Sequence, residues 1–455
     1  MKALSVVILA AGKGTRMKSN LPKPLHEIGG QPMLTHVLNT ARALNPTQLI
    51  VIYGHEGEKL KAHYQDEQDI TWVEQKTFLG TGDAMKYALP SILEDSNVLV
   101  LYADTPLIDQ ATLEKMLMNV DDQHVCWLTV EADQPFGYGR IVRDDAGNMM
   151  AIVEEKDAST DQKAITEINS GLFAASSKVL HATLPRLQNN NQQKEYYLTD
   201  VVTLAREDGI GIRTVSGDFT LIRGVNDRVQ LSELEAIYQN ERRKALMLSG
   251  VTLISPETVT IRGEIKLKGT DIIIEPNVTL EGVVSLGNNV HIGQGSVIQG
   301  AKLCDNVKVL PYSMIEHSLL YENVTIGPFA RLRTNSILKA DSKIGNFVET
   351  KNVTLGEGSK ASHLTYLGDA TIGRDVNIGA GTITCNYDGA NKHQTIIEDN
   401  VFVGSNSSLV APVEIKKGAT IGAGSIISST ITEGALALTR ATLRQVQNWR
   451  RPTKK

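Results

Sequence analysis

The stretch LAAGKGTRM, residues 9–17, is the first part of this sequence that could do chemistry. It follows an apolar run, so a buried strand would end in a glycine turn that carries the cations Lys13 and Arg16. Backbone N–H groups in such a turn can face an anion, and the two cations favour phosphate. The glycine spacing matches neither GxxxxGK[ST] nor GxGxxG, which excludes a P-loop and a dinucleotide fingerprint. Taken alone, a plain glycine-rich turn is an equally good interpretation.

Two further segments could act on a phosphate. Lys23 lies between the prolines of LPKPL, which stiffen the chain around it. Asp104 follows the apolar run in NVLVLYADTPL, and a carboxylate at a strand end is a natural hard ligand for Mg²⁺. The alternative role for Asp104 is a helix N-cap before the TPL turn.

A second group of candidates lies far along the chain. His363, in KASHLTYLG, has the side chain best suited to take a proton near neutral pH, as N-acetylation of an amine requires. Arg333 and Lys351 suit a phosphate on the acceptor, and Glu349 could orient or support His363. The alternative is that His363 is a solvated surface residue.

The elements that must position these residues fall into two halves with different periods. Up to about residue 225, apolar runs such as SVVILA, QLIVIY and NVLVLY alternate with helical patterns such as MLTHVLNTARAL and TLEKMLMNV. This alternation predicts an α/β fold with a mainly parallel sheet, whose ligands bind at the carboxyl ends of the strands. LAAGKG and YADTPL would both lie there. Residues 228–248 have helical spacing and predict a connecting helix.

From about residue 250 an aliphatic residue recurs every six positions, commonly followed by glycine. A hexapeptide period is typical of a parallel β-helix, in which three repeats make one triangular coil. An antiparallel sheet would show period-two alternation instead. The expected inward residues are Ile274, Leu280, Leu286, Ile292, Ile298, Leu303, Val309, Ile315, Ile326, Leu332, Leu338, Ile344, Leu355, Leu367, Ile372, Ile378, Ile396, Val403, Leu409, Ile415, Ile421 and Ile427.

The block TCNYDGANKH, residues 384–393, breaks this period, with Thr384 and Ala390 at expected aliphatic positions. We therefore predict a loop that projects from the β-helix, where functional residues tend to gather. The predicted domains are residues 1–227 and 249–437, joined by the helix of residues 228–248 and followed by a tail of residues 438–455.

Composition narrows the function classes. A chain of 455 residues exceeds one ordinary hydrophobic core, and its net charge of -5 comes from nearly balanced acids and bases. We therefore expect neither nucleic acid nor a membrane as a partner. The three cysteines lack CxxC spacing, which argues against disulfides and zinc and favours the cytoplasm. MKALSVVILAA could also be a secretory signal, but it leads unbroken into the glycine turn, which favours a first strand.

Together, LAAGKGTRM and LPKPL closely resemble the sugar-1-phosphate nucleotidyltransferases, which join a nucleoside triphosphate to a sugar phosphate and release pyrophosphate. With the hexapeptide half included, the whole chain resembles the bacterial bifunctional family of N-acetylglucosamine-1-phosphate uridyltransferases and glucosamine-1-phosphate acetyltransferases. The resemblance implies a Rossmann-like nucleotidyltransferase domain, a left-handed parallel β-helix and a homotrimer. It implies that glucosamine-1-phosphate is acetylated with acetyl-CoA and that N-acetylglucosamine-1-phosphate then receives UMP from UTP with Mg²⁺. The product, UDP-N-acetylglucosamine, would supply peptidoglycan and lipopolysaccharide synthesis.

At the first site, the resemblance implies that Arg16 and Lys23 are catalytic cations and that Asp104 and Asn226 bind Mg²⁺ and substrate. Ala103 departs from the family, because many relatives have glycine there and the added methyl could crowd the ribose. The other substrate contacts that it implies are Leu9, Ala10, Ala11, Gly12, Lys23, Gln75, Gly80, Thr81, Tyr102, Ala103, Gly139, Glu154 and Asn169.

At the second site, the resemblance implies that His363 is the catalytic base. It also implies an acetyl-CoA groove between neighbouring β-helices packed about a threefold axis. The acceptor contacts would be Arg333, Glu349, Lys351, Tyr366, Asn377, Asn386 and Tyr387, and the acetyl-CoA contacts Ala380, Ser405, Ala423 and Arg440.

Two other functions remain open at this point. A nucleotidyltransferase with one activity could use the β-helix only to assemble subunits or bind an effector, although His363, Lys351 and Arg333 argue against it. A non-enzymatic interaction protein could be built from the same two parts. A scaffold would have no use for Lys23 and Asp104, which argues against this function.

Overall fold

The computed structural model describes residues 2–54 and 56–454. The chain divides into two compact units, Met1–Tyr238 and Gln239–Lys455. The boundary falls inside α9 (Arg228–Leu248), which has the bounds of the helix expected at residues 228–248. Within the described residues, none of the helices has both the length and the apolar character needed to cross a membrane.

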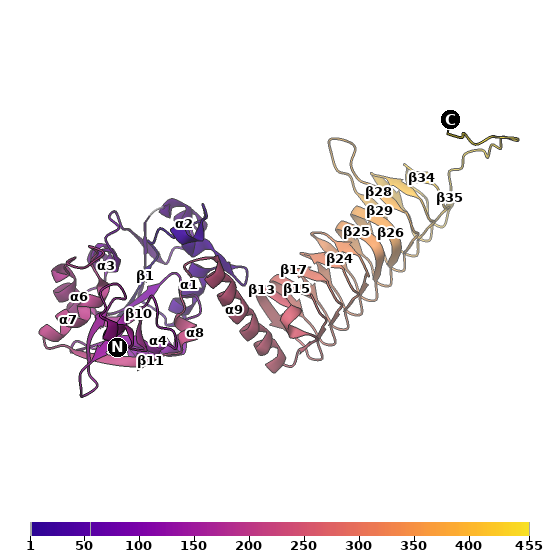
Figure 1. Cartoon of the computed structure of the whole chain (residues 1–455). Helices are drawn as coiled ribbons and strands as arrows, with labels where there is room; N and C mark the ends of the chain where they lie inside the picture. Colours follow the sequence, from indigo (N-terminus) through magenta and orange to yellow (C-terminus); the bar gives the residue numbers. More distant parts are fainter. Residues whose placement is uncertain (1, 55, 455) are drawn as a thin grey trace. The chain divides into compact units, whose positions relative to one another are not determined.

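The first unit, indigo to magenta in Figure 1, contains a mixed, mainly parallel sheet. Its strand order is β11-β7-β10-β6-β1-β4-β5. Only β10 of this series runs antiparallel to its neighbours, and the hairpin of β8 and β9 pairs with it. The prediction of a mainly parallel sheet is confirmed. The strands are β1 (Ala3–Leu9), β4 (Gln48–Tyr53), β5 (Ile70–Glu74), β6 (Ser96–Tyr102), β7 (His124–Glu131), β8 (Arg140–Arg143), β9 (Met149–Val153), β10 (Glu167–Ser176) and β11 (Gly211–Ser216), with the short pair β2 (Glu27–Ile28) and β3 (Gln31–Pro32) beside them.

Helices cover both faces of this sheet. On β1, Val6 and Ile8 belong to the core under α1, α2, α4 and α8, whereas Val7 and Leu9 belong to the core under α3, α6 and α7. Burial on both faces explains why the first strand is an unbroken apolar run. The helices are α1 (Met33–Ala43), α2 (Gly57–His63), α3 (Thr81–Ala88), α4 (Gln110–Leu117), α5 (Thr160–Lys163), α6 (Ser177–Thr183), α7 (Val201–Glu207) and α8 (Phe219–Ile222).

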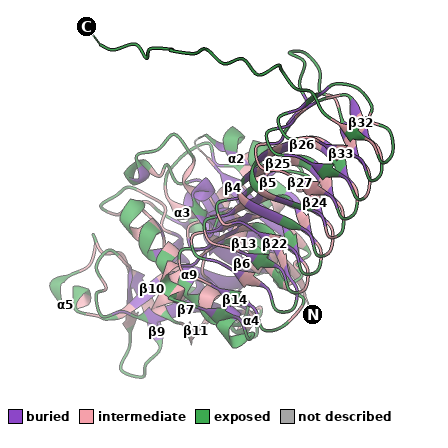
Figure 2. Ribbon diagram, turned by 90° about the vertical axis from the view of Figure 1, so that its right-hand side faces the viewer, coloured by how far each residue is buried: buried purple, intermediate pink, exposed green. Residues whose placement is uncertain are grey.

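The second unit is a parallel β-helix (Figure 2). Ile274 pairs with Ile292 and Ile292 with Val309, so equivalent strands recur every 17 or 18 residues, three hexapeptides per coil. The first strands are β12 (Thr252–Leu253), β13 (Thr260–Leu267), β14 (Ile273–Ile274), β15 (Thr279–Leu286), β16 (His291–Ile292), β17 (Val297–Gln299), β18 (Lys302–Leu303), β19 (Lys308–Val309), β20 (Met314–Glu316), β21 (Leu319–Leu320), β22 (Thr325–Ile326) and β23 (Arg331–Leu332). The later strands are β24 (Ser336–Leu338), β25 (Lys343–Leu355), β26 (Lys360–Ile372), β27 (Asn377–Ile378), β28 (Ile383–Cys385), β29 (Thr395–Ile397), β30 (Phe402–Val403), β31 (Ser408–Val410), β32 (Val413–Ile415), β33 (Thr420–Ile421), β34 (Ile426–Ile427) and β35 (Leu436–Ala437).

The predicted inward residues are buried in the axial core of the β-helix, with one exception. Ile396 was expected to point inward, and this prediction was wrong. Thr395 and Ile397 are buried, whereas Ile396 is only half-buried. The reason is the loop before β29, because its length sets the register in which β29 pairs with β26 and shifts the inward face by one residue.

The loop predicted at residues 384–393 is confirmed from residue 386 onward, and it projects between β28 and β29 (Figure 1). Tyr387 and Lys392 form an isolated bridge across it. Thr384 itself stays in the coil as a buried residue of β28, and its Oγ1 donates to the carbonyl of Gly368 at 3.0 Å. A hydrogen-bonded threonine therefore replaces an aliphatic residue in the core.

Neighbouring isoleucines on β14 provide a test of the β-helix core. Ile274 is 0% exposed and Ile273 is 37% exposed. Replacing Ile274 with alanine should lower the free energy of unfolding by about 2–5 kcal/mol, because it leaves a cavity among close-packed side chains. Ile273→Ala is the matched control and should have a much smaller effect. Urea unfolding followed on the second unit would measure both, and equal effects would contradict the inward assignment.

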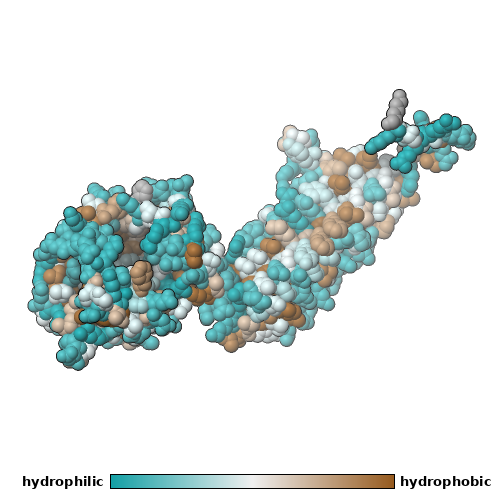
Figure 3. Space-filling model, viewed as in Figure 1, coloured by the Kyte–Doolittle hydropathy of each residue, from teal (hydrophilic) through white to brown (hydrophobic). Residues whose placement is uncertain are grey.

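Large apolar side chains remain at the surface of the second unit, where hydrophobic residues lie among pale ones in the space-filling view (Figure 3). Four of them, Tyr312, Phe329, Phe347 and Leu364, occupy the same corner on successive coils, and we call them the corner ladder. The three aromatic rings stack at centroid distances of 5.4 and 5.6 Å. All four residues have a positive φ, which is unusual for such bulky residues.

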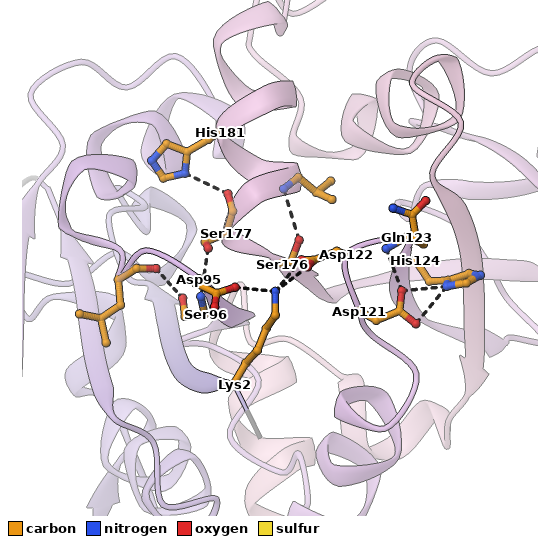
Figure 4. Close-up of polar contacts among 12 residues, drawn as sticks. Lys2, Asp95, Ser96, Asp121, Asp122, Gln123, His124, Ser176, Ser177 and His181 are labelled. Carbon is orange, nitrogen blue, oxygen red and sulfur yellow. Dashed lines mark hydrogen bonds and ion pairs between the residues drawn. The ribbon is translucent and has the colours of Figure 1, made fainter.

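At the amino ends of the strands in the first unit, a lysine joins three segments (Figure 4). The Lys2 ammonium donates to both carboxylate oxygens of Asp122 at 2.7 Å and pairs with Asp95 at 2.7 Å. These residues precede β1, β7 and β6 respectively, so the cluster ties the starts of three strands together. The predicted phosphate turn and Asp104 lie at the opposite ends of β1 and β6.

Candidate active sites

A cavity of about 580 Å³ opens at the carboxyl ends of β1 and β6. The structure thus brings together most of the residues predicted for the first site, including the glycine turn, Lys23 and Asp104. The predicted residues that line it are Leu9, Ala10, Ala11, Gly12, Lys23, Gln75, Gly80, Thr81, Tyr102, Ala103, Asp104 and Glu154. Arg16, Gly139, Asn169 and Asn226 lie behind or beside this lining, and their contacts are given below.

The turn after β1 has a backbone that needs glycine at one position. Gly14 has φ 58°, and a Cβ there would lie 2.8 Å from Cβ of Lys23. The absence of a side chain lets the LPKPL segment pack directly on the turn. Met17, at the end of the turn, is buried against Ile28 and Met33, which anchors the loop.

Lys23 joins the two predicted metal ligands. Its ammonium donates to the carboxylate of Asp104 and, at 3.2 Å, to Oδ1 of Asn226, and Arg16 donates to the same Oδ1 at 2.9 Å. One carboxylate oxygen and one amide oxygen therefore converge on the Lys23 ammonium. Oxygen atoms of these two kinds are ligands that suit Mg²⁺. Among the described residues, no group of three or more His, Cys, Asp or Glu side chains could hold a metal ion.

The alternative role of Asp104 as a helix cap is wrong. The N-cap of α4 is Asp109, whose carboxylate accepts from the backbone N–H of Thr112 at 2.8 Å. Asp104 lies on the strand side of this turn, and its backbone carbonyl accepts from the N–H of Val225 at 3.0 Å. That bond holds the segment of Asn226 against the end of β6.

The opposite end of the cavity offers amide and hydroxyl groups. Nε2 of Gln75 donates to Asp83 at 2.7 Å and to the carbonyl of Gly80 at 3.3 Å. Because the amide nitrogen is held by the protein, the carbonyl oxygen is the group that can meet a ligand. Thr81 Oγ1 accepts from the backbone N–H of Leu198 at 3.3 Å, which fixes this hydroxyl at the start of α3.

A third part of the cavity is acidic. The Glu154 carboxylate accepts from the hydroxyl of Thr199 at 3.2 Å, and burial raises the pKa of Glu154. Burial also raises the pKa of the neighbouring Tyr102 phenol. The backbone N–H of Asn169 donates to the carbonyl of Gly139 at 2.8 Å, which joins two predicted sugar contacts next to Glu154. Oδ1 of Asn169 accepts from Trp127 Nε1 at 3.0 Å, so its side chain is oriented by the protein.

Some lining residues were missed by the sequence analysis. Gln193, Glu195 and Tyr197 come from the loop after α6 and close one side of the cavity. Tyr197 donates to Asp157 at 3.2 Å and accepts from Gln193 at 2.9 Å. The loop has no periodicity and no glycine turn, so nothing in its sequence indicated that it folds onto the site. Phe78, beneath the ammonium of Lys13 at 5.2 Å from the ring centroid, was also missed, although Gly80 and Thr81 next to it were predicted.

On the second unit, His363 lies at the corner of the prism that carries the corner ladder. Leu364, the next residue, belongs to that ladder with φ 44°. His363 is exposed, and its hydrogen-bond partner differs from the one expected. Nδ1 of His363 lies 2.9 Å from Oδ1 of Asn346, the residue opposite it on the preceding coil.

The expected support of His363 by Glu349 is wrong in this structure. Glu349 lies opposite Tyr366, and its carboxylate accepts from Arg333 at 2.9 Å. The reason is the coil length, because a step of 17 residues places Asn346 opposite His363. Glu349 and Tyr366 therefore belong to the face beside the corner, where an acceptor sugar could lie.

Three cations border this face. Arg333 and Lys351 lie on adjacent coils, because the Arg333 N–H donates to the carbonyl of Thr350 at 2.8 Å. The ammonium group of Lys392 lowers the pKa of Lys351, and Arg333 adds to this effect. Lys392 was missed as a candidate, although the block that breaks the hexapeptide period contains it. Like charges held this close are suited to an anion with more than one negative charge.

The two predicted loop residues, Asn386 and Tyr387, differ from each other in their contacts. Asn386 donates to Asp369, which also accepts from Asn352 at 2.7 Å. Tyr387 is exposed, and its hydroxyl donates to the carbonyl of Gly389 at 2.6 Å within the loop. Asn386 is thus fixed to the coil near Lys351, whereas the Tyr387 hydroxyl is bonded within the projecting loop.

The predicted acetyl-CoA contacts continue the corner of His363. The Gly381 N–H donates to the carbonyl of Leu364 at 2.9 Å, and the Asn406 N–H donates to the carbonyl of Ala380 at 2.7 Å. On the next coil, the Gly424 N–H donates to the carbonyl of Ser405 at 2.8 Å. Ala380, Ser405 and Ala423 are therefore small residues in line with His363 on later coils, whereas Arg440 belongs to the exposed tail.

One predicted acceptor contact is separated from the others. Asn377 pairs with Lys360, three residues before His363, so it lies on the face across the corner from Tyr366. The structure of one chain therefore does not bring Asn377 to Lys351.

The comparisons with known proteins agree with the division of the chain into an α/β unit and a β-helix. The MobA-like NTP transferase domain matches residues 6–171, the GMPPB C-terminal domain matches residues 261–355, and the hexapeptide repeat of succinyl-transferase matches residues 394–429. The bifunctional protein GlmU of Marinobacter nauticus is 49% identical over 456 residues, which cover 100% of both chains. The chain belongs to the GlmU family. The GlmU of Acinetobacter baylyi is 50% identical over 451 residues, 99% of both chains.

Membership in the GlmU family decides between the functions left open by the sequence. The chain is a bifunctional transferase, with uridyltransferase activity on a nucleotidyltransferase unit and acetyltransferase activity on a left-handed β-helix, and it makes UDP-N-acetylglucosamine. Among solved structures, a putative glucose-1-phosphate thymidylyltransferase from Bacillus anthracis is 18% identical, with a TM-score of 0.43 over 52% of this chain and 95% of that chain. That likeness is too weak to support an argument.

Proposed function

We propose that the two sites described above carry the two activities, with UTP and N-acetylglucosamine-1-phosphate in the cavity of the first unit. The observation that carries this proposal is the convergence of Asp104, Asn226 and Arg16 on the Lys23 ammonium at the carboxyl edge of the sheet. A phosphate site needs cations, and a metal site needs oxygen ligands beside them. The cavity supplies both in one place.

Uridylyl transfer requires no protein nucleophile. An oxygen of the sugar phosphate attacks the α-phosphorus of UTP and pyrophosphate leaves, so the protein must position two anions and neutralise charge. Arg16 and Lys23 would hold the phosphates, Gln75 and the turn of Leu9 to Gly12 would bind the uridine, and Glu154 would hold a sugar hydroxyl. Asp104 and Asn226 would hold Mg²⁺, which when bound offsets the charge that develops on the phosphates.

On the β-helix, we assign the acceptor to the face of Glu349 and Tyr366. Its phosphate would meet Arg333, Lys351 and Lys392, and its amino group would face His363. His363 takes one proton from the ammonium group, the free nitrogen attacks the thioester carbonyl, and the C–S bond breaks. The leaving thiolate takes the second proton from the nitrogen, which becomes the amide, and departs as CoA. Acetyl-CoA would extend from His363 over Ala380, Ser405 and Ala423, where small residues leave room for the pantetheine arm, towards Arg440.

The assembly proposed for this chain is a homotrimer. Two observations support it: the exposed corner ladder, and the separation of Asn377 from the rest of the acceptor site. A second copy would cover the stacked rings and could bring its own Asn377 to the face of Tyr366. Analytical ultracentrifugation should give a molecular mass three times the 49.5 kDa of one chain. A monomer with full acetyltransferase activity would contradict this assembly.

We also propose a cytoplasmic location, in keeping with the free thiols of the described residues.

One assay tests the assignment of both activities. Glucosamine-1-phosphate, acetyl-CoA, UTP and Mg²⁺ are supplied together, and free thiol and pyrophosphate are followed separately. Both products should form, with pyrophosphate dependent on acetyl-CoA unless N-acetylglucosamine-1-phosphate is added. Thiol release without any pyrophosphate, or the reverse, would contradict a chain with two working sites.

Replacing Lys392 tests the phosphate end of the acceptor site. Lys392→Met should raise the KM for glucosamine-1-phosphate about tenfold and change kcat much less, because one charged hydrogen bond to the phosphate is lost. Lys308→Met, an exposed lysine on β19, is the matched control and should leave both constants unchanged. An unchanged KM in the Lys392 variant would exclude it from the site.

A further inference from the structure

We propose that Asn346 is a positioning residue for the catalytic imidazole of His363. The inference rests on the proposed role of His363 as base and adds the group that orients it. Oδ1 of Asn346 lies 2.9 Å from Nδ1 of His363, and the two residues are direct neighbours on β25 and β26. Glu349, the residue expected to orient His363, instead accepts a hydrogen bond from Arg333.

The chemistry of the contact determines which ring nitrogen can act. An amide carbonyl oxygen only accepts hydrogen bonds, so Nδ1 must carry the proton that it donates. Neutral histidine has one ring proton, and Nε2 therefore keeps its lone pair and acts as the base. Without this contact, the exposed imidazole would be free to rotate and to exchange tautomers, and the correct one would be present only part of the time.

The backbone around Asn346 holds this arrangement rigidly. A Cβ on Gly345 would lie 2.0 Å from the carbonyl oxygen of Ser362, so the two coils touch immediately before the pair. Phe347, immediately after, stacks on Phe329 at 5.6 Å. Asn346 is thus held between a close backbone contact and the corner ladder.

Among the described residues, the charged groups on the strand that faces His363, β25, are Lys343, Glu349 and Lys351, and those on its own strand are Lys360 and Asp369. Arg333 and Lys392 border the same face beside Lys351. The turn of residues 379–381, on the next coil, carries none. A new charge at position 346 would therefore be the nearest one to the imidazole, which makes pH dependence a sensitive readout.

Two substitutions of Asn346 in the full-length protein test the proposal. Asn346→Leu keeps the size of the side chain but removes the acceptor, and it should lower kcat for acetyl transfer about tenfold with little change in the KM for glucosamine-1-phosphate. Asn346→Asp keeps an acceptor and adds a negative charge, which stabilises the imidazolium. The pH at which kcat/KM reaches half its plateau should rise by about one unit, and activity should recover above it.

The control is Asn288→Leu, which removes another inter-coil bond, from Asn288 to Asp305 at 3.0 Å, away from the site. It should leave acetyl transfer unchanged, and all variants should keep uridylyl transfer. Unchanged kcat and pH profile in both Asn346 variants, or equal losses in Asn288→Leu, would overturn the proposal. So would a loss in Asn346→Asp that no pH restores. If the parent protein lacks acetyl transfer, or His363→Gln retains it, the proposed function itself fails, which is a separate outcome.

Discussion

Replacing Asp104 with asparagine should reduce uridylyl transfer by about 10²–10³-fold and leave acetyl transfer unchanged. The carboxylate is the anionic member of its cluster with Lys23, Asn226 and Arg16, and asparagine keeps its size while removing its charge. In the proposed site, both the affinity for Mg²⁺ and the position of the Lys23 ammonium would depend on that charge. Pyrophosphate release from UTP and N-acetylglucosamine-1-phosphate, measured over a range of Mg²⁺ concentrations, would give the size of the effect.

Asp109→Asn is the matched control, because it makes the same change five residues away. Asp109 caps α4, and asparagine is an equally good N-cap, so this variant should keep its activity and stability. An Asp104→Asn protein with most of its uridylyl transfer, or with equal losses of both activities, would contradict a metal-binding role for this carboxylate.

Replacing His363 with glutamine should reduce acetyl transfer by about 10²–10⁴-fold, the usual contribution of a general base. Glutamine can still donate and accept hydrogen bonds, but it cannot take a proton near neutral pH. Thiol release from acetyl-CoA should therefore almost cease, whereas pyrophosphate release from N-acetylglucosamine-1-phosphate should continue, because that reaction takes place on the other unit.

His291→Gln controls for the effect of losing a histidine from the β-helix. His291 lies on β16 and contacts Glu275 at 2.9 Å, several coils before His363. Acetyl transfer should be unchanged in this variant. Equal loss of both activities in the His363 variant would indicate damage to the whole protein and would argue against separate sites.

Ala103 is the position in the first site where this chain differs from the many relatives that have glycine. Ala103 is buried, lines the cavity, and donates its backbone N–H to the carbonyl of Leu9 at 3.0 Å. Its backbone is thus held in the sheet whatever the side chain is. The expectation that its methyl group crowds the ribose remains a prediction, which the KM for UTP of an Ala103→Gly variant would test.

Local patterns predicted most of the fold, because burial imposes a period on each element. An unbroken apolar run such as residues 3–9 indicates a strand buried on both faces, and a period of six indicates one inward side chain per face of a triangular coil. The same patterns failed where a loop changed the register, as at Ile396. The length of a loop that leaves the coil and returns has no period, so sequence alone could not place the next strand.

The sequence by itself determined which residue types are available for each reaction: phosphate-binding cations and a carboxylate at strand ends, and a histidine among hexapeptide repeats. Only the tertiary structure decided which of them meet. The length of each coil pairs His363 with Asn346 and Glu349 with Tyr366. Chain folding likewise brings Asn226 to Lys23 across 203 positions and Lys392 to Lys351 from a loop. These contacts depend on register and loop path, which are set by packing of the whole unit and leave no local signal in the sequence.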